Sequence, residues 1–186
     1  MEQRWQQISW WHWDADAAEW SDQHSENLYE NYIYEFGTGG RGDELHNLTL
    51  LSFNVMHDDW GREHIVQTDR RFRRTLDLLE RANADFIGLN EVNKQFQQML
   101  LKEDWVKKGY FVSDASEAAE TLKSPSGNVL LSRVPFHSLY TIALTSCTRK
   151  AVVCIVDLCV SGEMVNSLSL SLSLSLSLSL SYALTN

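Results

Sequence analysis

Polar and apolar residues alternate from residue 48 to residue 55, and this period of two predicts a β-strand with one buried face. The apolar face of the strand consists of Leu51, Phe53 and Val55. The opposite face carries Asn54, which the pattern places at the end of the strand. The polar, glycine-containing segment 56–68 predicts a loop after it.

A helix is predicted to follow this loop, with Asp69 available to cap it and an end near Asn83. Its apolar stripe repeats at helical spacing and consists of Phe72, Leu76, Leu79 and Ala82. The next segment, 85–92, is a short apolar run with polar flanks, which is the pattern of a buried strand. Glu91 lies at the carboxyl end of this predicted strand.

The chain after this strand predicts one more helix and then a series of strands. The helix covers residues 94–107, and its apolar side consists of Phe96, Met99, Leu100 and Val106. The strands are predicted at residues 110–113, 129–132, 139–144, 151–160 and, after a turn at 161–163, at 164–166. Because helices alternate with strands first and strands follow strands later, we expect an α/β (α+β) fold with a mixed β-sheet and flanking helices.

The segment 167–180 consists of seven Ser-Leu units. Strict alternation is the hydropathy of a half-buried strand, so a strand is one interpretation of this segment. The other is translated simple-sequence DNA, because a CT dinucleotide repeat gives alternating TCT and CTC codons, which encode Ser and Leu. We expect the second, and therefore a low-complexity tail over residues 167–186.

Residues 1–44 differ in composition from the rest of the chain. They contain five of the seven tryptophans and carry ten acidic and two basic residues, against fifteen acidic and fourteen basic residues elsewhere. We expect a flexible extension here, and a short partner-binding helix within residues 1–36 is the alternative. The nearly neutral remainder lacks the basic surface through which proteins neutralise nucleic-acid phosphates.

The sequence predicts an intracellular protein, in the cytoplasm or the nucleus. It shows no secretory signal and no transmembrane run of about 18 apolar residues. Its three cysteines do not follow a zinc-binding spacing, and Cys154 and Cys159 lie in an apolar run, which indicates buried thiols and a reducing compartment.

Asn54 and Glu91 are the candidate catalytic residues. Each is predicted at the end of a strand in one sheet, so their side chains can converge on one edge, the usual position of a site in layered α/β structures. Carboxylate and amide oxygens are hard ligands that suit Mg²⁺ or Mn²⁺, and water and a substrate phosphate complete the coordination. The pair therefore predicts a metal site.

Five short segments resemble, in order, motifs of the endonuclease/exonuclease/phosphatase superfamily. The first two are Leu51–Val55 and Phe86–Val92, separated by an amphipathic helix. The later ones are Gly109–Asp114, Ser126–Arg133 and Thr148–Asp157. The resemblance covers residues 48–166, so we take residues 45–166 as a partial domain of this type.

The resemblance implies a four-layered α/β sandwich, present in part, and Mg²⁺-dependent cleavage of phosphate esters in a nucleic acid or a small molecule. It implies that Glu91 holds the metal and that Asn54 orients the scissile phosphate. Asn128 is a weaker candidate for binding the substrate, and the alternative for this residue is a turn position entering a strand.

The sequence departs from the family pattern after Asn166. Family members continue with a Thr-His-Leu segment, a Gly-Asp-x-Asn motif and a closing Asp-His pair, whereas Ser167 begins the Ser-Leu repeat here. Because the missing Asp positions the attacking water and the missing His contacts the phosphate, we expect a truncated and inactive phosphoesterase domain. A non-catalytic fragment, or a module that binds a protein through the aromatic extension, is the alternative function.

A cluster of four arginines surrounds Phe72, at Arg70, Arg71, Arg73 and Arg74. On an amphipathic helix this pattern predicts a solvated face around one buried aromatic ring, and contact with phosphate groups is the alternative.

Overall fold

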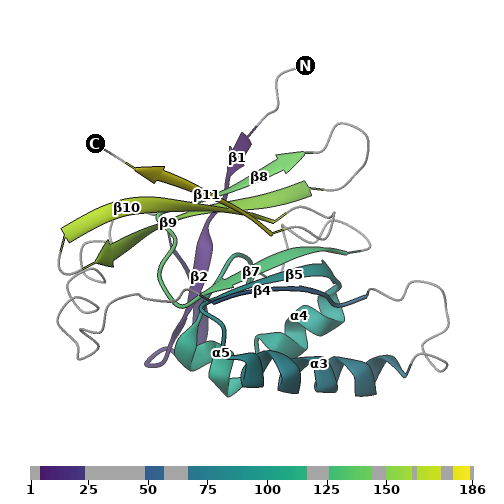
Figure 1. The fold of residues 1–186 in the computed structure, drawn as a ribbon. Helices are drawn as coiled ribbons and strands as arrows, with labels where there is room; N and C mark the ends of the chain where they lie inside the picture. The colour runs from purple at the N-terminus through teal and green to yellow at the C-terminus, as the bar shows by residue number, and fades with distance from the viewer. Residues whose placement is uncertain are drawn as a thin grey trace.

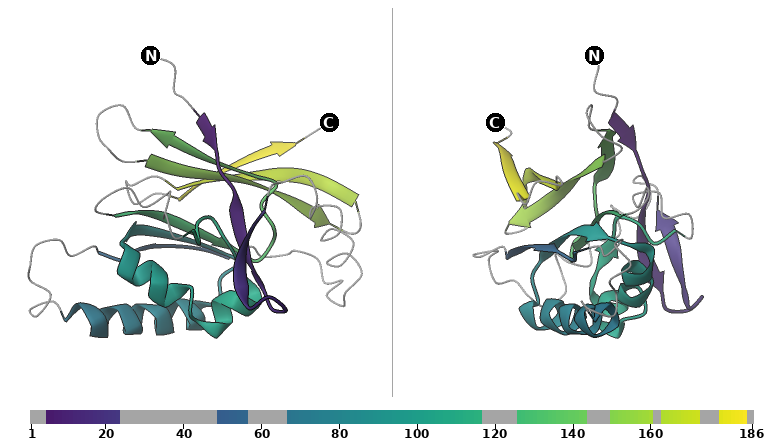
Figure 2. Two further views of the ribbon diagram at one scale, coloured as in Figure 1. Left: turned by 180° about the vertical axis from the view of Figure 1, so that it is seen from behind. Right: turned by 90° about the vertical axis from the view of Figure 1, so that its right-hand side faces the viewer.

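The computed structural model describes residues 5–23, 49–56, 67–116, 126–143, 150–160, 163–172 and 178–184. These residues form three layers (Figure 1). Helices cover one face of a six-stranded sheet, and a five-stranded sheet packs against its other face (Figure 2). The predicted mixed α+β class is confirmed.

The six-stranded sheet has the order β3-β2-β6-β7-β5-β4. In this order its strands are Glu19–Gln23, Trp10–Asp14, Phe111–Val112, Gly127–Ser132, Phe86–Val92 and Leu50–Asn54. Only the β4–β5 pair is parallel, and the other pairs of this sheet are antiparallel, so the sheet is mixed. One connection through a helix, between β4 and β5, accounts for the parallel pair.

The five-stranded sheet is antiparallel and has the order β1-β8-β9-β10-β11. Its strands are Trp5–Gln7, Ser138–Ala143, Lys150–Val160, Glu163–Leu172 and Leu178–Leu184. The strands from β4 to β9 lie within two residues of their predicted positions, whereas β10 was predicted at 164–166 and continues to Leu172. The predicted turn at 161–163 differs, because Glu163 already belongs to β10, and residues 161–162 lie outside the described part.

The first helix, α3 (Thr68–Ala82), follows its apolar stripe with one exception. Phe72, Leu76 and Leu79 are buried as predicted, but Ala82 is exposed and Thr75 is buried instead. Asp69 does not cap the helix. The cap position is Gln67, which gives no side-chain cap, and the Asp69 carboxylate in the first turn accepts a hydrogen bond from Gln95 Nε2 at 2.8 Å.

The predicted helix over residues 94–107 is wrong, because two helices occupy this region: α4 (Lys94–Leu100) and α5 (Asp104–Gly109). Leu100 and Val106 are both fully buried. Leu100 and Val106 are six residues apart, so on a continuous helix their side chains would point about 120° apart. One straight helix could therefore not bury both. A tight turn at 101–103 resolves this, and Glu103 becomes the cap residue of α5.

The helices of the described part are short, and none is long and apolar enough to cross a membrane. They bury an apolar layer against the six-stranded sheet. Phe72 and Phe96 meet edge to face there, with ring centroids 5.0 Å apart. The sheet contributes Ile87 and Leu89 from β5 and Val129 and Leu131 from β7.

A second apolar layer lies between the two sheets and is built around Trp10, which is 2% exposed. Its ring meets Phe111 and Phe136 edge to face, at centroid distances of 5.2 and 6.4 Å. Leu139 and the buried Cys154 belong to the same layer. Trp10 therefore joins the N-terminal region to the core.

Residues 5–23 differ from the predicted flexible extension, because they form β1, β2 and β3. The chain pairs with β8 of one sheet through Trp5–Gln7 and with β6 of the other through Trp11. Residues 24–48, which complete the predicted extension, lie outside the described part of the chain.

The Ser-Leu repeat contributes to two strands of the five-stranded sheet. Pairing of β10 with β11 runs from Asn166 and Leu184 to Leu172 and Leu178, and β10 also pairs with β9. The backbone thus follows the strand interpretation of this segment, whereas its origin in a dinucleotide repeat stays a prediction.

We expect Trp10→Ala to lower the free energy of unfolding by about 3–5 kcal/mol, because it empties the centre of the layer between the sheets. Trp5→Ala is the matched control, since Trp5 is 55% exposed and its ring meets Tyr140 edge to face. Its loss should cost less than about 1.5 kcal/mol. Urea unfolding checks both values, and equal costs would show that β2 is not part of the core.

Glu103 generates a prediction about pH. Partial burial raises its pKa above the ordinary 4.5, and the carboxylates of Glu80, Asp77 and Asp104 raise it further. A raised pKa means that the folded state disfavours the charged form of Glu103 and favours the protonated form. The contribution of the protonated form to the free energy of unfolding is therefore fully present below the unfolded pKa, and it is lost as pH rises through the folded pKa. Glu103→Gln should therefore raise the melting temperature at pH 7 and leave it unchanged near pH 3. A difference that is the same at both pH values would contradict this.

Candidate functional site

The parallel strands β4 and β5 place two asparagines opposite each other. Asn54 is the register partner of Asn90, and the Val55 N–H donates to the Asn90 carbonyl at 2.9 Å. Partners in a sheet direct their side chains to the same face. Their neighbours Phe53 and Leu89 pack on the helix side, so the two amides lie on the face toward the second sheet.

Hydrogen bonds at the other end of the two strands fix this register. Asp85 Oδ2 accepts from the backbone N–H and the hydroxyl of Thr49 at 2.9 and 2.6 Å, and the Asp85 N–H donates to Thr49 Oγ1 at 2.9 Å. A shift by one residue would break all three bonds and turn Asn54 to the opposite face.

A β-bulge interrupts β5 at its carboxyl end. Leu89 pairs with Val129 and Val92 pairs with Gly127, so β5 has two residues where β7 has one. Leu89 and Val92 are both fully buried against the helices. The extra residue therefore leaves Asn90 and Glu91 on the same face of the sheet.

Asn128 is the single residue of β7 opposite the bulge. It is the second residue of the strand and 1% exposed, so the turn position considered for it is wrong. Leu130, two residues later, packs between the sheets, which puts Asn128 on the same face as Asn54 and Asn90. Three neighbouring strands thus bring three amides and one carboxylate to one end of the sheet.

The amide of Asn54 is oriented by a local turn. Its Oδ1 accepts a hydrogen bond from the Met56 N–H at 2.7 Å, and Met56 has φ of 61°. This hydrogen bond engages Asn54 Oδ1, the oxygen that the sequence assigned to a metal. The Nδ2 group remains as a donor. Asn54 is therefore better suited to donate to an anionic oxygen than to ligate a cation.

Asn90 was missed as a site residue in the sequence. It is 1% exposed, and neither its Oδ1 nor its Nδ2 has a hydrogen-bond partner among the described residues. Burial of an unpaired amide costs about 1–3 kcal/mol. The signal for it was an amide inside an otherwise apolar run, directly before Glu91.

Glu91 holds an unfavourable backbone conformation, with φ of 56°. This region costs a residue with a side chain about 1–3 kcal/mol, and such strain gathers at functional sites. Glu91 is half-buried, and its carboxylate forms no hydrogen bond or ion pair with the part of the chain described. It is therefore available to a ligand.

These donors fit a hard cation only in part. Glu91 offers a carboxylate and Asn90 offers an amide oxygen without a partner, which suits an ion that keeps several water ligands. Within the described ranges no group of three or more His, Cys, Asp or Glu residues could hold a metal. Asp114 follows the nearby strand β6, but its Oδ1 accepts from the N–H and hydroxyl of Ser116 at 3.0 and 2.7 Å.

Compared with known family models and with curated proteins, the chain matches none of them.

We expect Glu91→Gly to be about 1 kcal/mol more stable than Glu91→Ala, because only glycine adopts a positive φ without strain. The two variants remove the same carboxylate, so their difference isolates the backbone. At an ordinary strand position the order reverses, and alanine is more stable by roughly 0.5–1 kcal/mol. Urea unfolding measures the difference, and an alanine variant at least as stable as the glycine variant would exclude strain at Glu91.

Proposed function

We propose that this chain carries the metal-holding edge of a phosphate-ester hydrolase of the endonuclease/exonuclease/phosphatase type. The bulge in β5 is the observation that carries the proposal, since it puts Glu91 beside Asn90 on the face that Asn54 and Asn128 share. The sequence resemblance independently assigns roles to Asn54 and Glu91.

The composition of the site supports an anionic substrate. Amide groups can donate to phosphate oxygens without adding negative charge, and only one carboxylate stands among the three amides. A bare carboxylate repels a phosphate unless a cation lies between them. Glu91 is thus better explained by a site that holds Mg²⁺ or Mn²⁺ than by direct contact with substrate.

The roles follow from the hydrogen bonds. Glu91 would hold the cation with the amide oxygen of Asn90, and Asn54 would donate through Nδ2 to a phosphate oxygen. Asn128, across the bulge, would contact the substrate. A bound divalent cation neutralises charge on the phosphate oxygens and on the leaving group.

The described residues of the site include no free group that could activate water. The sequence contains neither a Gly-Asp-x-Asn segment nor an Asp-His pair. Asp114, a buried carboxylate after β6, is engaged by Ser116. We therefore propose that this chain binds the cation and hydrolyses phosphate esters no faster than background.

The alternative function, a protein-binding module based on the aromatic N-terminal segment, has less support. Trp10 is buried between the sheets, and the Trp20 Nε1 donates to the Leu101 carbonyl at 3.2 Å. Trp13 meets Trp20 edge to face and lies under Lys107, whose Nζ is 4.2 Å from the Trp13 ring centroid. These aromatic side chains serve the fold of the chain itself.

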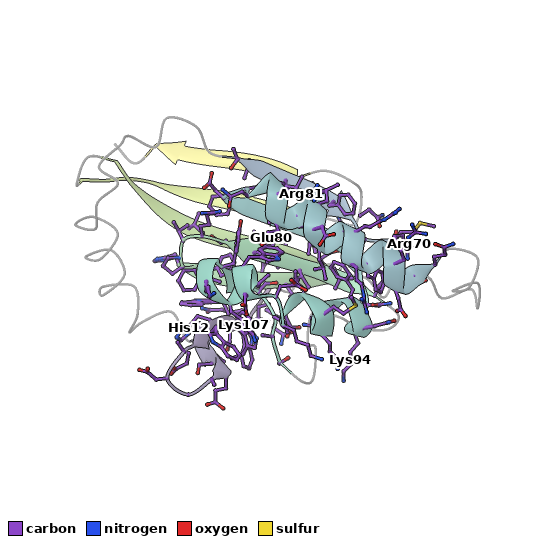
Figure 3. The ribbon with its side chains drawn as sticks, turned by 90° about the horizontal axis from the view of Figure 1, so that it is seen from below. His12, Arg70, Glu80, Arg81, Lys94 and Lys107 are labelled. Carbon is purple, nitrogen blue, oxygen red and sulfur yellow. The ribbon has the colours of Figure 1, made fainter. Side chains whose placement is uncertain are left out.

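The test is Mn²⁺ binding, followed by electron paramagnetic resonance, in the full chain and in two variants. Glu91→Gln should weaken binding by about tenfold or more, the equivalent of about 1.4 kcal/mol. Glu80→Gln is the control, because Glu80 is an exposed carboxylate on α3. Figure 3 shows it on the helix side of the molecule. All three proteins should leave bis(4-nitrophenyl) phosphate unhydrolysed.

Two results would change the proposal. Equal Mn²⁺ binding by the Glu91→Gln and Glu80→Gln variants would remove Glu91 from the site. Hydrolysis by the full chain that Glu91→Gln abolishes would support the site and refute the inactivity.

A further inference from the structure

A hollow of about 350 Å³ lies on the helix side of the molecule, between α3 and the edge strand β4. Three arginines of α3 line it, Arg70, Arg71 and Arg74, and Phe53 and Leu78 contribute apolar surface. Figure 3 shows Arg70 near one end of α3, with Arg81 toward the other end. The hollow is as large as many sites for small ligands.

Arg71 differs from the prediction that the arginine cluster of α3 forms a solvated face. Its three guanidinium nitrogens are buried and have no hydrogen-bond partner among the described residues. The guanidinium carbon lies 5.4 Å from the ring centroid of Phe72, which provides one weak cation–π contact. A buried charge without a counter-charge is strongly unfavourable, and an anionic ligand would supply the counter-charge.

Among the described residues that line the hollow, the neighbours of Arg71 add positive charge and no negative charge. Arg70 and Arg74 are exposed at the rim, and Arg70 Nη1 donates to Gln67 Oε1 at 3.2 Å. The part of the lining that the structure describes contains no carboxylate. The arginines belong to the first two turns of α3, where the helix dipole also favours an anion.

We propose that this hollow binds the phosphate group of a small phosphate monoester. Guanidinium groups match the oxygens of a phosphate with paired, charge-assisted hydrogen bonds. Phe53 and Leu78 would contact the organic part of the ligand, which a free phosphate ion lacks. Phe53 packs on the helix side of β4 and Asn54 faces the other side, so this site is distinct from the proposed metal edge and does not depend on it.

The test is calorimetric titration of the full chain with phenyl phosphate and with inorganic phosphate. Phenyl phosphate should bind more tightly, because its ring covers apolar surface. Arg71→Gln should raise its Kd about tenfold or more, as expected when one charge-assisted bond is lost. Arg73→Gln is the matched control, since Arg73 is exposed on the same helix outside the hollow, and it should change Kd less than about twofold.

A second variant separates binding from folding. Arg71→Leu removes the unpaired charge, so it should raise the melting temperature of the free protein and abolish the further rise that phenyl phosphate causes in the parent chain. Arg74→Gln, at the exposed rim, should weaken binding without a loss of folded protein. A parent chain that does not bind phenyl phosphate at about 1 mM overturns the proposal. Equal weakening by Arg71→Gln and Arg73→Gln overturns it too, because binding would then follow overall charge.

Discussion

Thr49 and Asp85 exchange three hydrogen bonds at the start of β4 and β5, and these bonds fix the register on which the candidate site depends. Side chains alternate between the faces of a strand, so these three hydrogen bonds determine which residues face the helices and which face the second sheet. Phe53 and Leu89 fall into the apolar layer under the helices, while Asn54 and Asn90 fall on the other face. The bulge after Leu89 then adds Glu91 to that second face.

Two groups in this structure are buried at a cost to stability. The amide of Asn90 and the guanidinium of Arg71 both lack hydrogen-bond partners in the described chain, and they belong to opposite sides of the six-stranded sheet. Neither arrangement stabilises the fold by itself, because an apolar side chain of similar volume would fit each position without a desolvation penalty. Both costs are offset if each group meets a ligand.

The strands from β4 to β9 and the boundaries of α3 could be predicted from the sequence, because local periodicity reports burial directly. The break between α4 and α5 could not be predicted. Phe96, Leu100 and Val106 were assigned to one apolar side of a single helix, and the separate orientation of α5 is seen only in the structure. The bulge at Asn90 and Glu91 is visible only against the register of β7. The strands in residues 5–23 were missed for a similar reason, because Trp11 pairs with Val112 and no local pattern encodes such a distant partner. Asn54 and Glu91 became candidates because the pattern predicted them at strand ends, whereas Asn90 looked like an interruption of an apolar run.

The crossing of residues 5–14 between the two sheets also bears on the order in which the molecule assembles. β1 requires Ile142 and its neighbours in β8, and β2 requires β6, so residues 5–14 are synthesised well before the strands with which they pair. Contacts this distant in sequence form slowly. Throughout that interval Trp10 has no apolar layer to enter, so its ring stays exposed to water until the two sheets meet.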